Sequence, residues 1–302
     1  MASYAESLRL SGMEPEFQAI DDHYLRMTDR NTGIVTSVEQ QTISRVVIAQ
    51  AGVGGNSDVT ITLAQMGFQH FRIADPDVFE VSNFNRQLGA RMPTLFRNKA
   101  DVIAQEILEI NPDADVRAYI DGVTWDNVEE FVDGADIVID GLDISVMHLR
   151  EKMFDLAREK GIPVFTCPVL GWGAGIAVFD PETSPSFREF FGKIPEDADS
   201  EEWHRFIERY AVNFLSARPT GIDIQLGKKR AKQGTPPSIA AACRLNAALV
   251  STAVYGFLFD KGSIPVVPTT LHIDLLGTRM SVTGPKKRFL VRKALGVLSK
   301  ED

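Results

Sequence analysis

The sequence predicts an α/β protein with a Rossmann-like mixed sheet, in which parallel strands come first, antiparallel strands are added later, and helices cover both faces. Two observations predict this fold. An apolar run at 46–49, typical of a buried parallel strand, leads through a glycine-rich turn at 52–55 into a helical apolar pattern at 59–66. A second apolar segment at 71–74 comes next and ends at Asp75. Strand, glycine turn, helix, strand and acid are the order of a nucleotide-binding βαβ unit.

The glycine turn indicates a phosphate-binding loop. Gly52, Gly54 and Gly55 let backbone N–H groups approach phosphate oxygens, and the N-terminus of the next helix adds partial positive charge. Asp75 stands where an acid binds a ribose hydroxyl. NAD-dependent oxidoreductases carry a similar turn and are therefore one alternative.

The residues after Asp75 make the pattern more specific. An Asp-x-Asp motif at 75–77, a Ser-Asn-x-x-Arg-Gln motif at 82–87 and Lys99 come after the glycine turn in that order. This combination resembles the ThiF-type adenylyltransferases, the superfamily of ubiquitin-activating enzymes and of the molybdopterin- and thiamine-sulfur-carrier activators. The resemblance covers residues 22–180 well and 236–283 loosely.

The resemblance implies a role for each motif. Asp75 would hold the ribose, while Asn83, Arg86, Gln87 and Lys99 would surround the phosphates. The implied nucleotide-binding set is Gly52, Gly54, Gly55, Asp75, Asp77, Asn83, Arg86, Gln87 and Lys99. The chemistry requires such cations, because attack of a carboxylate on the α-phosphorus brings two anions together. Arg86 offers planar bidentate donors and Lys99 a mobile point charge.

Glycine and proline stops divide the next part of the chain. Asn111-Pro112 ends an amphipathic helix, and Gly161 and Pro163 end a second one. The expected elements are helices at 99–110, 125–132 and 146–160, with strands at 115–119, 137–140, 164–167 and 176–179. As in relatives, the glycine-rich turn at 171–175 is expected to switch the sheet from parallel to antiparallel.

The strand at 137–140 ends at Asp140, and Asp143 lies in the loop after it. Carboxylates at the C-terminal end of a parallel strand face the ligand crevice. Relatives have an Asp-x-x-Asp pair here whose second member binds magnesium, so the resemblance implies Asp143 as the Mg²⁺ ligand. Ile144 replaces the asparagine usual in relatives. The alternative is an N-cap for the helix that begins near Ser145.

Two further residues bear on the site. Relatives place an arginine shortly before the first strand, and it reaches the partner subunit's nucleotide. Arg26 matches that position, with Arg30 as competitor and a solvated surface arginine as the alternative. The implied catalytic set is Arg26, Arg86, Lys99 and Asp143, in a homodimer. Asp58, in the first turn of the helix after the glycine loop, would repel a triphosphate unless it points away, as we expect.

The chain divides into four parts. Residues 1–44 form an arm that contributes to the dimer partner's site, 45–180 the nucleotide-binding core, 181–235 a crossover insertion that covers the acceptor, and 236–302 the rest of the same domain. The insertion contains a helical pattern at 203–215 and a basic run at 228–232 that we expect to be a solvated loop. A long apolar helix to Phe259, strands at 270–273 and 280–283, and a mobile basic tail from Gly284 are expected at the end.

Composition limits the function. The net charge of −9 over 302 residues argues against a broad nucleic-acid surface. Two cysteines, Cys167 and Cys243, cannot form a tetrathiolate site, so no zinc is expected, and packing is favoured over a thioester role for Cys167. No signal peptide or membrane-spanning run is expected, which predicts a cytoplasmic protein without a membrane partner.

The sequence therefore predicts an ATP- and Mg²⁺-dependent adenylyltransferase acting as a homodimer. It would activate the C-terminal carboxylate of a ubiquitin-like protein, sulfur carrier or peptide as an acyl-AMP and release pyrophosphate. One alternative is a tRNA threonylcarbamoyladenosine dehydratase-like enzyme, which uses the same adenylation and which the acidic charge disfavours. An NAD-dependent oxidoreductase gives the Ser-Asn-x-x-Arg-Gln motif and Lys99 no role. A non-catalytic binding module would normally lose Arg86 or Asp143.

Overall fold

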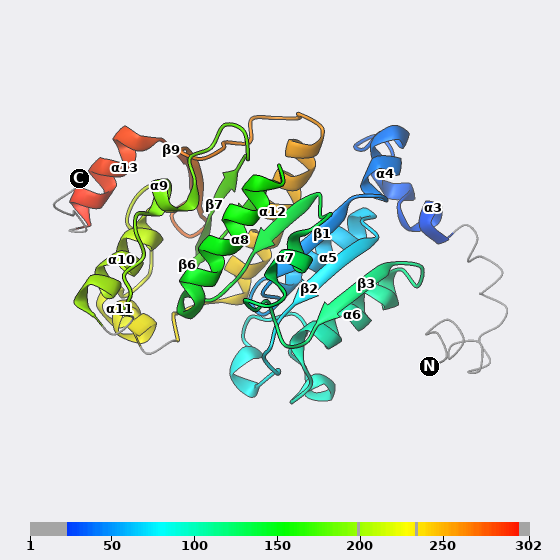
Figure 1. The fold of residues 1–302 in the computed structure, drawn as a ribbon, viewed down its shortest axis with the longest axis horizontal. Helices are drawn as coiled ribbons and strands as arrows, with labels where there is room; N and C mark the ends of the chain where they lie inside the picture. Colours follow the sequence, from blue (N-terminus) through cyan, green and yellow to red (C-terminus); the bar gives the residue numbers. More distant parts are fainter. Residues whose placement is uncertain (1–22, 198–199, 233–234, 296–302) are drawn as a thin grey trace.

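The computed structural model describes residues 23–197, 200–232 and 235–295. Within these ranges a nine-stranded sheet runs through the centre of the molecule, in the order β3-β2-β1-β4-β5-β7-β8-β9, with β6 paired to β7 (Figure 1). The strands are β1 (Val47–Ala51), β2 (His70–Ala74), β3 (Asp115–Tyr119), β4 (Ile137–Asp140), β5 (Val164–Thr166), β6 (Val169–Leu170), β7 (Gly173–Phe179), β8 (Thr270–Asp274) and β9 (Arg279–Thr283).

The sheet changes direction where the sequence predicts it. β1 pairs in parallel with β2 and β4, β2 with β3, and β4 with β5. β7 then runs antiparallel to β5 and β8, and β9 runs antiparallel to β8. The mixed sheet and its parallel first half are confirmed. The glycine-rich segment is not only a turn, because Gly173 and Gly175 lie inside β7.

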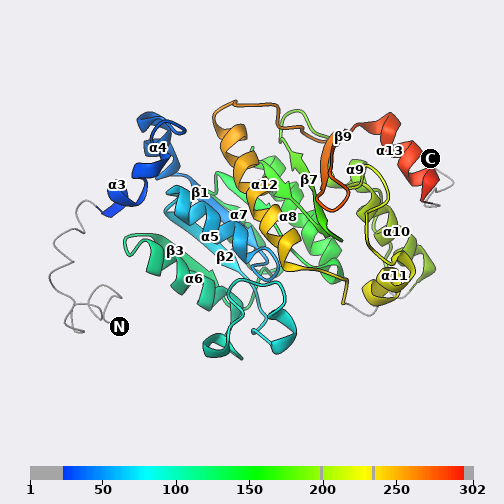
Figure 2. The ribbon, with the colours of Figure 1, turned by 180° about the vertical axis from the view of Figure 1, so that it is seen from behind.

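Helices cover both faces of the sheet. One face carries α5 (Ser57–Met66), α6 (Lys99–Ile110) and α12 (Ala240–Leu258), which share one apolar core cluster (Figure 2). The other face carries α7 (Val128–Val132), α8 (Met147–Glu159), α9 (Phe187–Phe191) and α10 (Glu201–Val212), which share a second one. Phe154, Phe179 and Phe187 make edge-to-face ring contacts within this second core.

The N-terminal helices lie at the far end of the helix layer from the glycine turn. They are α3 (His23–Met27) and α4 (Ser37–Ile43), with a short 3₁₀ turn at Asp29–Asn31 between them. The Tyr24 hydroxyl donates to the carbonyl of Gly67, which caps the C-terminus of α5 (3.0 Å). His23 Nε2 lies 2.9 Å from the carbonyl of Ile110, the last residue of α6. Both contacts hold α3 at the C-terminal ends of α5 and α6.

Two expectations about the C-terminal half are wrong. The basic run lies in helix α11 (Ile224–Lys232) rather than in a loop, and Lys228 pairs with Glu208 of α10 at 3.0 Å. The segment after Gly284 forms helix α13 (Pro285–Ala294) instead of a mobile tail. In α13 the buried Arg288 donates to the carbonyls of Pro268 and Thr283 (2.8 and 3.2 Å), which fixes the helix to the sheet.

From the sequence we expect no segment that is long and apolar enough to span a membrane. By length and apolar composition alone, one helix does meet that description. Among the described residues, α12 has the length and the apolar composition of a membrane span, with a mean hydropathy of 1.3. Half of this apolar segment of α12 is buried inside the fold, and core helices of soluble proteins have the same length and composition. α12 packs on α5 and β7, where Val250 and Val254 lie in the core.

Candidate active site

The glycine turn forms a tight connection between β1 and α5 and lies against the loop after β4. Gly52 has a φ of +83°, and a Cβ there would strike the backbone of Gly141, so only glycine fits. The Gly141 N–H donates to the carbonyl of Ala51 at 2.7 Å. The glycine loop and the loop that leads to Asp143 are therefore held side by side.

Two polar side chains converge on Gly54. A Cβ at this position would lie 3.3 Å from Gln87 Nε2 and 3.5 Å from Lys99 Nζ. At Gly55 a Cβ would meet no heavy atom within 4 Å, so the backbone there is open to a ligand. The structure thus places the lysine and the glutamine of the predicted set beside the glycine loop.

Asp75 fixes the loop from the end of β2. One carboxylate oxygen accepts from the Val53 N–H and the other from the Asp77 N–H, both at 3.0 Å. Burial raises the pKa of Asp75, while the charge of the nearby Lys99 acts in the opposite direction. Each carboxylate oxygen has a second lone pair, so the group can still accept from a ribose hydroxyl.

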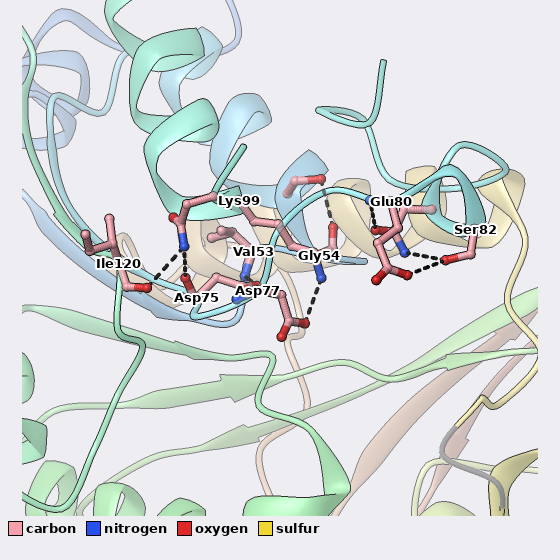
Figure 3. Close-up of polar contacts among 11 residues, drawn as sticks. Val53, Gly54, Asp75, Asp77, Glu80, Ser82, Lys99 and Ile120 are labelled. Atoms are coloured by element: carbon pink, nitrogen blue, oxygen red, sulfur yellow. Dashed lines mark hydrogen bonds and ion pairs between the residues drawn. The ribbon is translucent and has the colours of Figure 1, made fainter. Parts of the chain in front are cut away.

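Lys99 is the first residue of α6, and its side chain is only 8% exposed. Its ammonium pairs with Asp77 at 2.8 Å (Figure 3), and the Asp77 side chain is 68% exposed. The neighbouring Asn98 was missed by the sequence reasoning. Its side chain caps α6 and also donates to the carbonyls of Asp75 and Ile120 (3.0 and 3.1 Å), which joins the ends of β2 and β3. An asparagine before a helical run is a readable N-cap signal.

The Ser-Asn-x-x-Arg-Gln segment forms a compact loop beside the glycine turn. The side-chain oxygen of Asn83 accepts from the Glu80 N–H at 3.0 Å, so this residue shapes the 3₁₀ turn Val81–Asn83. Arg86 donates to the Ser82 carbonyl and to the Asn85 amide oxygen, and it forms no ion pair with any described residue. Gln87 is buried, and its Oε1 has no partner within the described part of the chain.

Asp140 and Asp143 have separate roles. Asp140 is buried and pairs with the buried Arg150 at 2.9 Å, which makes it structural. Asp143 is exposed and precedes the short turn Ile144–Val146, but its side chain makes no capping hydrogen bond. α8 begins later, with Val146 at its N-cap, so capping does not account for Asp143.

No cluster of three or more histidine, cysteine or acidic side chains suited to a metal occurs among the described residues. Mg²⁺ bound together with a nucleotide needs only one or two carboxylates, because phosphate oxygens and water complete its shell. The single exposed carboxylate of Asp143 fits that mode of binding. The magnesium assignment stays a prediction.

Asp58 is buried, and its carboxylate pairs with Arg244 of α12. Burial raises the pKa of Asp58, and the hydrogen bond from Arg244 opposes that shift. As expected, the acid turns toward another part of the fold, where a cation compensates it. Its partner, 186 residues away in sequence, was not predicted.

Arg26 is not brought to the site of its own chain. It lies on α3, which contacts the C-terminal ends of α5 and α6, whereas the glycine loop and Lys99 lie at their N-terminal ends. Helices of 10 and 12 residues separate the two ends by about 15–18 Å at ~1.5 Å per residue. The competitor Arg30, in the turn after α3, belongs to the same end of the molecule.

The cysteines behave as packing residues. Cys167 and Cys243 are both buried and free. Burial strongly raises the pKa of Cys167, which disfavours the thiolate that a thioester would require.

Comparison with known proteins places these features in a family. Residues 28–289 match the model of the ThiF family. The chain is 33% identical over 121 residues to the tRNA threonylcarbamoyladenosine dehydratase of Bacillus subtilis, covering 39% of this chain and 48% of that protein. It is 31% identical over 153 residues to the SAMP-activating enzyme E1 of Haloferax volcanii, covering 51% of this chain and 55% of that protein. It thus spans about half the length of these curated relatives.

A solved structure supports the fold assignment. The crystal structure of Escherichia coli MccB with ATP superposes with a TM-score of 0.61 at 18% identity, covering 81% of this chain and 65% of MccB. At this identity the likeness shows the shared fold alone.

Proposed function

The chain belongs to the ThiF family, and on that premise we propose that it is an ATP-dependent adenylyltransferase that activates an acceptor carboxylate. The observation that carries the proposal is the convergence of Lys99 and Gln87 on Gly54, beside a carboxylate fixed at the end of β2. This arrangement offers backbone donors, one nearly buried cation and one unpartnered amide oxygen around the place where a nucleotide phosphate would lie.

The reaction is built from these groups. A carboxylate oxygen of the acceptor attacks the α-phosphorus of ATP, the bond from that phosphorus to the bridging oxygen breaks, and its electron pair leaves with pyrophosphate. Lys99 exchanges its pairing with Asp77 for the phosphates, since Asp77 is exposed and water can solvate it. Arg86, whose present partners are neutral, adds a second positive charge as negative charge accumulates.

Magnesium is part of the proposal. Asp143 would hold Mg²⁺ at the loop adjoining Gly52, and the ion would neutralise charge on the phosphate oxygens. Asp75 positions the nucleotide rather than the metal, because both its oxygens accept from backbone N–H groups near the loop.

The N-terminal arm supports a homodimer. Arg26 lies too far from its own glycine loop to act there, so we propose that it completes the site of a second copy. An isologous dimer would give two equivalent sites, each with one arginine from the other subunit.

The proposal is tested by ATP–pyrophosphate exchange with candidate acceptors supplied one at a time. Exchange that depends on a carboxyl-bearing acceptor is expected. Exchange that needs no acceptor, or ATP cleavage to ADP, would contradict the proposal. The matched control is Lys99→Ala, which should bind acceptor but give no exchange.

A second candidate has one observation in its favour, the 33% identity to a tRNA threonylcarbamoyladenosine dehydratase. As such an enzyme, the protein would adenylate the carboxylate of the modified nucleoside on tRNA. The net charge of −9 disfavours a tRNA surface. Exchange stimulated only by threonylcarbamoyladenosine-containing tRNA would favour this candidate over a protein or peptide acceptor.

A further inference from the structure

A cavity of about 790 Å³ lies beside the loop that carries Asp143. Asp143 and Ser145 belong to its lining, and residues of α10 and α11 contribute much of the rest. The volume falls in the upper part of the range that encloses a drug-sized ligand. Most of the lining residues lie between positions 203 and 237, and none of them belongs to the predicted nucleotide-binding motifs.

The lining of this cavity is mainly apolar. Ile207, Val212 and Leu215 face it from α10 and the turn after it, and Leu170 and Ile222 belong to other parts of the wall. An apolar cavity of this size gains stability when apolar groups replace the water or empty space inside it.

Three of the charged side chains in the wall have polar partners. Lys228 and Glu208 pair at 3.0 Å across α10 and α11. The side chain of Asp223 accepts from the Leu226 N–H at 3.0 Å at the start of α11. Arg218 also lines the cavity and forms no ion pair with a described residue, so the wall offers one cationic group beside its mainly apolar surface. The carboxylate of Asp143 belongs to the part of the wall that adjoins the glycine loop.

We propose that this cavity binds the carboxyl-terminal side chains of a peptide acceptor and selects acceptors whose last residues are bulky and apolar. The inference rests on the proposed function, because the carboxylate would lie beside Asp143 and the apolar side chains along α10. An acceptor tail of glycines would leave the cavity unfilled and forfeit these contacts. Full burial of one large apolar side chain corresponds to at least about a tenfold gain in affinity.

The test is ATP–pyrophosphate exchange with two pools of hexapeptides that share random first four residues. One pool ends in two glycines, and the other ends in two residues drawn from leucine, isoleucine, phenylalanine and tryptophan. The apolar pool should give half-maximal exchange at a concentration at least about tenfold lower. Equal response, or preference for the glycine pool, would overturn the inference and leave the proposed function standing.

Three variants test whether the preference for apolar peptides depends on this cavity. Ala211→Phe fills the cavity from α10 and should erase the preference, and Ile207→Ala should weaken it. Arg205→Ala, on the exposed side of α10, is the matched control and should preserve it. Calorimetric ATP binding must be unchanged in all three, which separates a filled cavity from a misfolded protein.

The remaining outcomes are also decisive. An unaltered preference in Ala211→Phe would overturn the assignment to this cavity. No exchange with either pool would overturn the apolar-peptide inference. In that case carrier proteins and tRNA, tested next, decide whether the proposed adenylation itself fails.

Discussion

Arg244 gives the sharpest test of how the fold stabilises the helix that follows its glycine loop. Arg244 pairs with Asp58, whose side chain is 3% exposed, in the first turn of α5. Arg244→Ala would leave this carboxylate buried without its cation. Removing one partner of a fully buried pair costs about 3–5 kcal/mol, and an exposed pair contributes at most about 1 kcal/mol. Because the Arg244 side chain is 49% exposed, we expect an intermediate loss of about 2 kcal/mol in the free energy of unfolding.

Urea denaturation at pH 7 measures this loss as a lower midpoint at an unchanged slope. The second substitution, Asp58→Asn, should restore most of the stability, since it removes the uncompensated charge. Lys228→Ala is the control, because its pair with Glu208 is partly exposed on both sides and should cost no more than about 1 kcal/mol. Arg244→Ala should also weaken ATP binding, and Asp58→Asn should reverse this. If Arg244→Ala matches the control, or if Asp58→Asn rescues nothing, the reasoning is refuted.

Three other predictions concern the site and the core. Arg26→Ala should lose about 10³–10⁵ in exchange rate, the range for an arginine that acts in trans, and Lys99→Ala should be nearly inactive. A mixture of the two with proven subunit exchange should regain activity from hybrid dimers, and a dead mixture rejects the arginine acting in trans. Asp143→Ala should abolish exchange with the fold intact, whereas Asp143→Asn should keep a trace; normal exchange in the alanine variant would exclude the metal role. Burial lowers the pKa of His272 to about 4, so the unfolded chain binds more protons than the folded protein between pH 4 and 6.5. The free energy of unfolding should therefore fall by about 2 kcal/mol from this group as the pH drops from 7 to 5, and His272→Gln should remove that part of the slope; identical slopes would reject it.

The parts of the fold predicted from sequence are those specified by local pattern. The apolar runs of β1 and β2, Gly52 between them and Lys99 at the start of α6 all rest on short-range signals. α11 and α13 were predicted as a loop and a tail because their stability comes from contacts distant in sequence. Lys228 reaches back to α10, and Arg288 binds the carbonyl of Pro268.

In the candidate site, too, the features set by local motifs were predicted and those set by tertiary packing were not. Asp75, Gln87 and Lys99 lie together because the motif order encodes one supersecondary unit. The pairing of Asp58 with Arg244 could not be predicted from the sequence, since a single sequence does not show which helix packs beside the glycine loop. The cavity was also beyond sequence reasoning, because its walls come from several elements that only tertiary packing brings together.

The central claim is that a carboxylate oxygen of the acceptor becomes bonded to the α-phosphorus of ATP. It is tested most directly by using an acceptor that supports exchange, labelled with ¹⁸O in both carboxylate oxygens, and analysing the AMP by mass spectrometry after acyl transfer to hydroxylamine. The account predicts AMP that carries one ¹⁸O atom. Unlabelled AMP, or ADP as the nucleotide product, would contradict it.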